Sequence, residues 1–214
     1  MKFYFTKTPS IFKRIFSHYT WCFSSDKKHI YLTFDDGPTP EITNFVLTEL
    51  NKHNAKATFF CIGKNIEQHP VIFKQIIDDG HSVGNHTHNH LNGWKTKEKA
   101  YLKNIHKANT TASTTLSLQK LKLFRPPYGK IKSSQAKALQ KIGYKIIMWD
   151  VLSADFDKNI SKEKCLQNVL KNTKNGSIIV FHDSVKAKEK LFYTLPKVLA
   201  FFAKKEFEFK RIEP

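Results

Sequence analysis

Acidic residues are scarce in this chain of 214 residues. It has 18 Asp and Glu residues against 36 Lys and Arg residues, which leaves a formal charge of +18. A surface of this sign attracts polyanions such as nucleic acid, anionic lipid or acidic polysaccharide. The basic residues are spread along the chain, and no zinc-finger or RNA-binding aromatic motif accompanies them. We therefore expect solvated lysine faces and no nucleic-acid partner.

Cysteine is also rare. Cys22, Cys61 and Cys165 have no paired spacing, which argues against a disulfide framework and against a structural zinc ribbon. We expect them to be small buried hydrophobic side chains. Long apolar runs are missing as well, because no stretch approaches the ~18–20 residues that a membrane helix needs.

The N-terminal stretch is basic and apolar but does not predict a cleavable export signal, since Lys7, Lys13 and Arg14 interrupt the apolar residues. Residues 1–27 are expected to be an extension that packs on a catalytic domain of residues 28–214. Within it, residues 11–16 favour a short basic helix that either caps the fold or makes a weak peripheral contact with a membrane. The default expectation is a cytoplasmic monomer, with an envelope-associated role as the alternative.

Short apolar runs alternate with amphipathic stretches along the rest of the chain. Helices are expected at 39–54, 70–80, 96–112, 133–143, 161–176 and 190–206, the first with Thr39 as its N-cap. Strands are expected at 29–34, 56–63, 81–86, 122–125, 144–149, 177–182 and 207–212. This alternation predicts a parallel sheet in an α/β fold, and seven to eight such units favour a barrel-like closure. Functional side chains should then gather at the carboxyl ends of the strands.

Two polar clusters carry metal-site chemistry. His86 and His90 are four residues apart, which would place both imidazoles on one face of a helical turn. Two histidines with one carboxylate suit a divalent transition metal and leave a coordination position open. Asp35 and Asp36 follow the first strand side by side, although like charges this close repel. One of them is expected to bind the metal, and the other to act as a general base.

Five motifs in order resemble those of polysaccharide deacetylases, the NodB-homology domain of carbohydrate esterase family 4. They are TFDDGP at 33–38, HTHNH at 86–90, RPPYG at 125–129, WDVLSADF at 149–156 and VFH at 180–182. The resemblance spans about residues 28–212. It implies a distorted (β/α)7 barrel in a single domain and a zinc cofactor, with Co²⁺ or Ni²⁺ as alternatives.

The resemblance also implies a role for each matching residue. Asp36, His86 and His90 would hold the metal. Asp35 would be the catalytic base that activates water, and Arg125 would pair with it and keep it ionised.

The remaining roles concern the leaving group and the oxyanion. His182 would be the general acid that protonates the leaving amine, and Asp155 would keep it protonated. The backbone N–H of Tyr128 would stabilise the tetrahedral oxyanion. In the fourth motif Leu152 stands where the family commonly has Asp, and Phe156 where it has Trp, so the wall of the sugar groove is expected to differ.

The function implied is hydrolysis of N-acetyl groups on N-acetylglucosamine in peptidoglycan or chitin-like oligomers, giving acetate and a free amino sugar. An O-acetyl esterase of the xylan type would use the same metal site and remains the alternative. A catalytically idle glycan- or nucleic-acid-binding module is the third interpretation.

Overall fold

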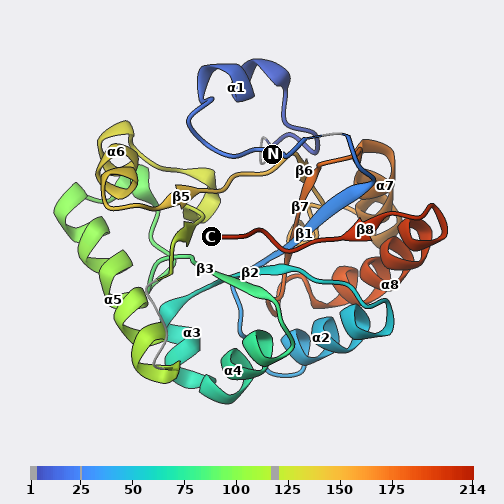
Figure 1. Cartoon of the computed structure of the whole chain (residues 1–214), viewed down its shortest axis with the longest axis horizontal. Helices are drawn as coiled ribbons and strands as arrows, with labels where there is room; N and C mark the ends of the chain where they lie inside the picture. Colours follow the sequence, from blue (N-terminus) through green and yellow to red (C-terminus); the bar gives the residue numbers. More distant parts are fainter. Residues whose placement is uncertain (1–3, 25, 117–120) are drawn as a thin grey trace.

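Parallel strands form the centre of the molecule, and helices surround them (Figure 1). The computed structural model describes residues 4–24, 26–116 and 121–214. The strands are β1 His29–Asp35, β2 Thr58–Cys61, β3 Ser82–Asn85, β4 Leu123–Phe124, β5 Lys145–Ile146, β6 Val151–Leu152, β7 Ile178–His182 and β8 Glu208–Phe209. The helices are α1 Ser10–Ile15, α2 Ile42–Lys52, α3 Gly63–Gln68, α4 Pro70–Asp78, α5 Glu98–Leu116, α6 Ser133–Lys141, α7 Lys162–Asn172 and α8 Lys188–Lys204, with short 3₁₀ turns η1 Gly93–Lys95 and η2 Pro127–Gly129.

The sheet has the order β5-β4-β3-β2-β1-β7-β6, and β8 pairs with the start of β1. All of these pairings are parallel. The result is a curled sheet with its helices outside, so the expected α/β fold, a distorted barrel in a single domain, is confirmed. Parallel strands bring their carboxyl ends to one edge of the barrel, which is where the motifs lie.

The N-terminal segment bridges the two ends of this sheet. Thr20 accepts a backbone hydrogen bond from Met148 beyond β5, and Thr6 accepts one from Leu152 in β6. Figure 1 shows α1 on this side of the molecule, next to β5 and β6. The segment therefore provides main-chain hydrogen-bond partners at both ends of the sheet, beyond β5 at one end and in β6 at the other.

Buried charge also fastens this segment. Asp150 is buried, and its carboxylate accepts hydrogen bonds from Lys7 and Lys13 and from the Ser177 hydroxyl. Burial alone would raise the pKa of Asp150, but the hydrogen bonds from Lys13 and Lys7 hold it below its ordinary value. The segment is thus tied to the barrel by a largely desolvated ion cluster.

The core is built around β1, whose residues are all buried from Leu32 to Asp35. The Phe34 ring stacks on Phe59 of β2 and Phe181 of β7, with ring centroids 5.1 and 6.0 Å apart. These rings lock the central strands in register up to the residues just before Asp35. Burial of this kind contributes roughly 1.5–3 kcal/mol for each large apolar side chain.

Three local expectations are wrong. The helix expected from residue 39 begins at Ile42, because Glu41 takes φ 63°, so Thr39 is no N-cap. The helix α3 was not expected at all. Cys61 and Cys165 are buried, but Cys22 is exposed. Among the described residues, no helix is both long and apolar enough to cross a membrane.

Candidate active site

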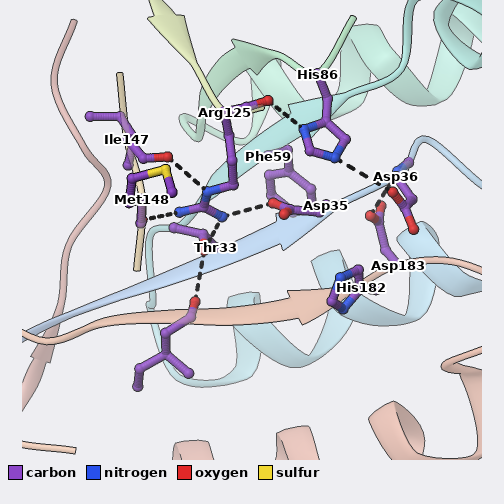
Figure 2. A network of polar contacts seen from close by, with 12 residues as sticks. Thr33, Asp35, Asp36, Phe59, His86, Arg125, Ile147, Met148, His182 and Asp183 are labelled. Carbon is purple, nitrogen blue, oxygen red and sulfur yellow. Dashed lines mark hydrogen bonds and ion pairs between the residues drawn. The ribbon is translucent and has the colours of Figure 1, made fainter. Parts of the chain in front are cut away.

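Four strand ends place the functional side chains. Asp35 ends β1 and lies in register with His182, which ends β7. His86 follows β3, and Arg125 follows β4, the strand paired with β3. Because these strands are parallel neighbours of one sheet, segments far apart in the sequence meet at one edge (Figure 2).

Asp36, His86 and His90 form a compact group of ligand atoms. One atom from each lies within 4.8 Å of the other two. Asp36 Oδ1 is 3.2 Å from His90 Nε2 and 3.7 Å from His86 Nε2. That oxygen is shielded from solvent and has no hydrogen-bond partner within the described part of the chain. A buried carboxylate oxygen facing two imidazole nitrogens fits a bound divalent cation, which would satisfy it.

His86 is held in the tautomer that a metal requires. Its Nδ1 lies 2.8 Å from the Arg125 carbonyl oxygen, to which it donates, so Nε2 keeps its lone pair (Figure 2). Burial, together with the neighbouring His90, lowers the pKa of His86 to about 3. Burial also lowers the pKa of His90. Both rings are therefore neutral at physiological pH, as ligands must be.

The two histidines meet through a loop, and the expected helical turn is wrong. Thr87 and His90 have φ 62° and 54°, in the left-handed region that side chains disfavour. Local hydrogen bonds compensate for this strain: Thr87 N donates to Asn85 Oδ1, and Leu91 N donates to Thr87 Oγ1. Asn104 Oδ1, on α5, accepts hydrogen bonds from the backbone N–H groups of His88 and Asn89. His88 lies apart, with Nε2 3.5 Å from Glu67.

Asp35 and Asp36 serve one site because the chain turns between them. Adjacent residues of an extended strand point to opposite faces, but Asp36 has φ 85°, which swings its side chain toward the histidines. The Asp36 carbonyl accepts a hydrogen bond from Asn65 Nδ2 at 2.7 Å, and its N–H donates to Phe60 O at 3.3 Å. The paired aspartates therefore have different partners: Asp36 faces the two histidines, and Asp35 pairs with Arg125.

Asp35 is held by a fully buried arginine. Arg125 Nη1 donates to Asp35 Oδ1 and to Thr33 Oγ1, both at 2.7 Å, and its other nitrogens donate to the Ile147 and Met148 carbonyls at 3.2 and 2.9 Å (Figure 2). Burial lowers the pKa of this guanidinium, and Asp35 opposes that effect. The ion pair thus fixes the position of the Asp35 carboxylate beside the group formed by Asp36, His86 and His90.

Asp183 is a buried carboxyl group beside the site that was not predicted from the sequence. It accepts hydrogen bonds from Gly37 N at 2.9 Å and from Thr43 Oγ1 at 2.6 Å, and its own N–H donates to Asp35 O. A Cβ on residue 37 would lie 1.9 Å from Asp183 Oδ2, so only glycine allows this approach. Burial, with Asp36 nearby, raises the pKa of Asp183 to about 7. Asp183 therefore braces the turn that carries both aspartates; its position directly after His182 was the only signal in the sequence.

His182 and Asp155 form a second dyad, besides the pair of Asp35 and Arg125. The carboxylate binds His182 twice, through Nδ1 at 2.7 Å and through the backbone N–H at 2.8 Å, which leaves Nε2 for a substrate. Burial alone lowers the pKa of His182, but the charge and hydrogen bond of Asp155 outweigh it and raise the pKa to about 9. The imidazole is thus protonated at neutral pH, as a general acid must be.

The departures in the fourth motif fall beside this dyad. Leu152 is buried within β6. The Phe156 ring lies edge-on to His182, with centroids 5.1 Å apart, and also contacts Tyr4 of the N-terminal segment at 5.7 Å. The Tyr128 ring lies 4.6 Å from the His90 ring, the Tyr128 side chain is 60% exposed, and the residue has φ 61°. The structure thus gathers all eight expected residues around one edge of the barrel, while their roles remain predictions.

Comparisons with known proteins agree with this geometry. The family model for polysaccharide deacetylase matches residues 24–147. A peptidoglycan-N-acetylglucosamine deacetylase of Bacillus cereus is 39% identical over 168 residues, which are 78% of this chain and 60% of that relative. A chitooligosaccharide deacetylase of Azorhizobium caulinodans is 34% identical over 75% of this chain and 76% of its own length.

A solved structure extends the likeness to the whole chain. The crystal structure of the Bc1960 peptidoglycan N-acetylglucosamine deacetylase, in complex with 4-naphthalen-1-yl-N-oxidanyl-benzamide, superposes with a TM-score of 0.88. It is 33% identical and the match covers 96% of this chain and 95% of that one. This chain therefore belongs to the polysaccharide deacetylase family. It spans less than two thirds of the first relative's length.

Proposed function

We propose that this protein removes N-acetyl groups from N-acetylglucosamine residues of a polysaccharide, releasing acetate and leaving a free amino sugar. One observation carries the proposal: the Asp36 oxygen that accepts no hydrogen bond from any described residue faces His86 and His90, while a separate carboxylate, Asp35, is held by Arg125. Relatives named as peptidoglycan and chitooligosaccharide deacetylases point to the same substrate class. Peptidoglycan is the favoured substrate, and chitin-like oligomers are the alternative.

The side chains of Asp36, His86 and His90 suit Zn²⁺, with Co²⁺ or Ni²⁺ as alternatives. Two neutral imidazoles and one carboxylate are a common zinc donor set that leaves a position open for substrate. When bound, the cation supplies Lewis acidity to the acetamide carbonyl and acidifies water in its coordination sphere. Asp36, His86 and His90 would hold it.

The proton transfers are assigned to the two dyads. Asp35, fixed in place by its hydrogen bond from Arg125, takes the proton of the attacking water. His182, charged because Asp155 lies against it, gives its proton to the departing amine nitrogen, which is a poor leaving group until protonated. The Tyr128 backbone N–H is assigned to the oxyanion that forms between these two transfers.

Acetate release tests the proposal. Wild-type protein with added zinc should release acetate from N-acetylglucosamine oligomers and from peptidoglycan, and a chelator should stop the release. Acetylated xylan assayed in parallel separates an N-deacetylase from an O-acetyl esterase. If zinc-loaded protein releases acetate from acetylated xylan but from neither N-acetylated glycan, the proposed reaction is wrong.

Two variants separate metal binding from proton transfer. Asp35→Asn should bind zinc in calorimetry as the wild type does, yet lose turnover. His86→Ala should lose stoichiometric zinc. Full zinc occupancy in the His86→Ala protein would refute the ligand assignment.

The N-terminal segment is proposed to be an extension of residues 1–27 on a catalytic domain of residues 28–214, in a monomeric protein. Ile11 and Ile15 of α1 are exposed beside Arg14, which supports weak peripheral contact with a membrane and an envelope-associated role. Co-sedimentation with anionic vesicles, compared between the wild type and Ile15→Asp, tests this. Equal sedimentation of the two proteins would exclude contact through α1.

A further inference from the structure

An exposed tryptophan stands on the rim of the proposed site. Trp94 is 59% exposed and follows the candidate ligand His90 by four residues. Four residues of chain span at most about 14 Å. Trp94 therefore lies within the reach of an oligosaccharide that places one of its sugars at His90.

The indole is held rigidly, unlike most exposed side chains. Its Nε1–H donates to the Ile131 carbonyl at 3.1 Å, and the Trp94 backbone N–H donates to Asn92 Oδ1 at 3.0 Å. A side chain fixed in this way loses little conformational entropy when it binds a ligand. The ring is thus a preformed surface open to solvent.

Two loops are locked together beneath it. Gly93 N donates to Lys130 O at 3.1 Å, and a Cβ on residue 93 would lie 2.5 Å from that same oxygen. Gln135 Nε2 then donates to the carbonyls of Gly93 and Thr96 at 3.0 and 3.2 Å. The loop that carries His90 and the loop that carries Tyr128 therefore form one continuous rim.

Cations line this rim. Lys130 Nζ lies over one face of the Trp94 ring, 5.1 Å from its centroid. Lys132 reaches across the two loops to the Thr96 carbonyl at 3.0 Å, and Lys95 and Lys97 follow the tryptophan in sequence. Positive charge beside a flat apolar ring suits a ligand with a pyranose face and a carboxylate.

We propose that Trp94 and Lys130 form a subsite for a sugar next to the reacting one in an anionic glycan. The face of the indole that Lys130 leaves uncovered packs on the apolar C–H face of that sugar, and the Lys130 ammonium pairs with a carboxylate substituent, as on a muramic acid whose lactyl group bears no peptide. This inference rests on the proposed deacetylase function and deepens it, since it selects carboxylate-bearing glycans over neutral chitin-like chains.

Steady-state acetate release tests the subsite with two substrates, a neutral N-acetylchitooligosaccharide and a muramic-acid-containing glycan of equal length. Trp94→Ala should raise KM for both about 3- to 10-fold, because the stacking surface serves both. Lys130→Met should raise KM only for the anionic glycan, about 2- to 5-fold. Added salt should raise the wild-type KM for the anionic glycan and leave that of Lys130→Met nearly unchanged.

Lys204→Met on α8 is the charge-matched control and should behave as the wild type. The subsite is refuted if Trp94→Ala leaves both KM values unchanged, or if Lys130→Met and Lys204→Met shift KM alike. Calorimetric binding of the anionic glycan to Asp35→Asn protein keeps the inference separate from the reaction. Weaker binding in the double variants Asp35→Asn/Trp94→Ala and Asp35→Asn/Lys130→Met supports it even without turnover, and unchanged binding overturns it.

Discussion

The buried pair of Arg125 and Asp35 gives a sharp prediction about stability and activity together. Replacing Arg125 by Met keeps much of the side-chain volume but removes the guanidinium. Asp35, which is 4% exposed, then loses the only cation that donates a hydrogen bond to it among the described residues. Thr33 and the Ile147 and Met148 carbonyls lose their donors as well.

The expected cost follows from this burial. Removing one partner of a buried, hydrogen-bonded ion pair typically costs about 3–5 kcal/mol, because the remaining charge is uncompensated. For a domain of this size each kcal/mol lowers the melting temperature by about 2–4 °C, so Arg125→Met should melt roughly 6–20 °C below the wild type. Turnover should vanish with it, since Asp35 loses its fixed position.

A double-mutant cycle isolates the electrostatic part. Asp35→Asn retains an oxygen that accepts from Arg125 Nη1 and should be less damaging than Arg125→Met. In Arg125→Met/Asp35→Asn no carboxylate remains to be stranded, so the double variant should be more stable than the sum of the single losses by about 1–3 kcal/mol. Urea unfolding of all four proteins in the presence of a chelator measures this without metal linkage.

Two outcomes would refute the reasoning. If Arg125→Met lowers the unfolding free energy by less than about 1 kcal/mol, the pair is not an obligatory buried partnership. If the double variant equals the sum of the singles, the loss comes from packing alone. Arg125→Lys is the informative control, because one ammonium can meet Asp35 but cannot reach every acceptor that the guanidinium fork serves.

Three other carboxyl groups give further predictions. Asp155→Asn should lower the pKa of His182 from about 9 toward or below its ordinary 6.5, because burial then dominates; NMR titration of metal-free protein measures this, and an unchanged value contradicts the dyad. Asp183→Asn should weaken zinc binding about 10- to 100-fold in calorimetry by loosening the turn at Gly37, and unchanged affinity would mean that the turn holds without it. Asp150 has a lowered pKa, so its contribution to stability is present above about pH 3.9 and is lost as the pH falls through its folded-state pKa. Asp150→Asn should remove that part of the pH dependence of the unfolding free energy measured with urea. If the unfolding free energies of the wild type and the variant change with pH by the same slope from about pH 3 to 6, this prediction is wrong.

Sequence periodicity predicted the fold well because strands buried on both faces leave a strong apolar signal. The run through Phe34 is such a case, and the helices that alternate with it imply a parallel sheet. The start of α2 was missed, since Glu41 adopts a left-handed backbone that no local pattern announces. The short helix α3 was missed because six residues carry too little periodicity to detect.

For the candidate site, the sequence named the residues but not the geometry that joins them. His86 and His90 were paired for the wrong reason: a strained loop, held by Asn85 and Asn104, brings them together where a helical turn was expected. Asp183 carried no pattern of its own, because its role depends on the close approach of Gly37, from the turn that follows β1.

The chemical identity of the side chains and their order along the chain were therefore determined by the sequence: two adjacent carboxylates, two histidines four apart, an arginine and a distant histidine. Which of these meet was decided only in three dimensions, and the residue types alone left open which of the two carboxylates faces the histidines. One physical reason is that parallel strands bring their carboxyl ends to one edge of the sheet. The other is that the positive φ of Asp36 turns its side chain toward the histidines, whereas a continued strand would point it to the face opposite Asp35.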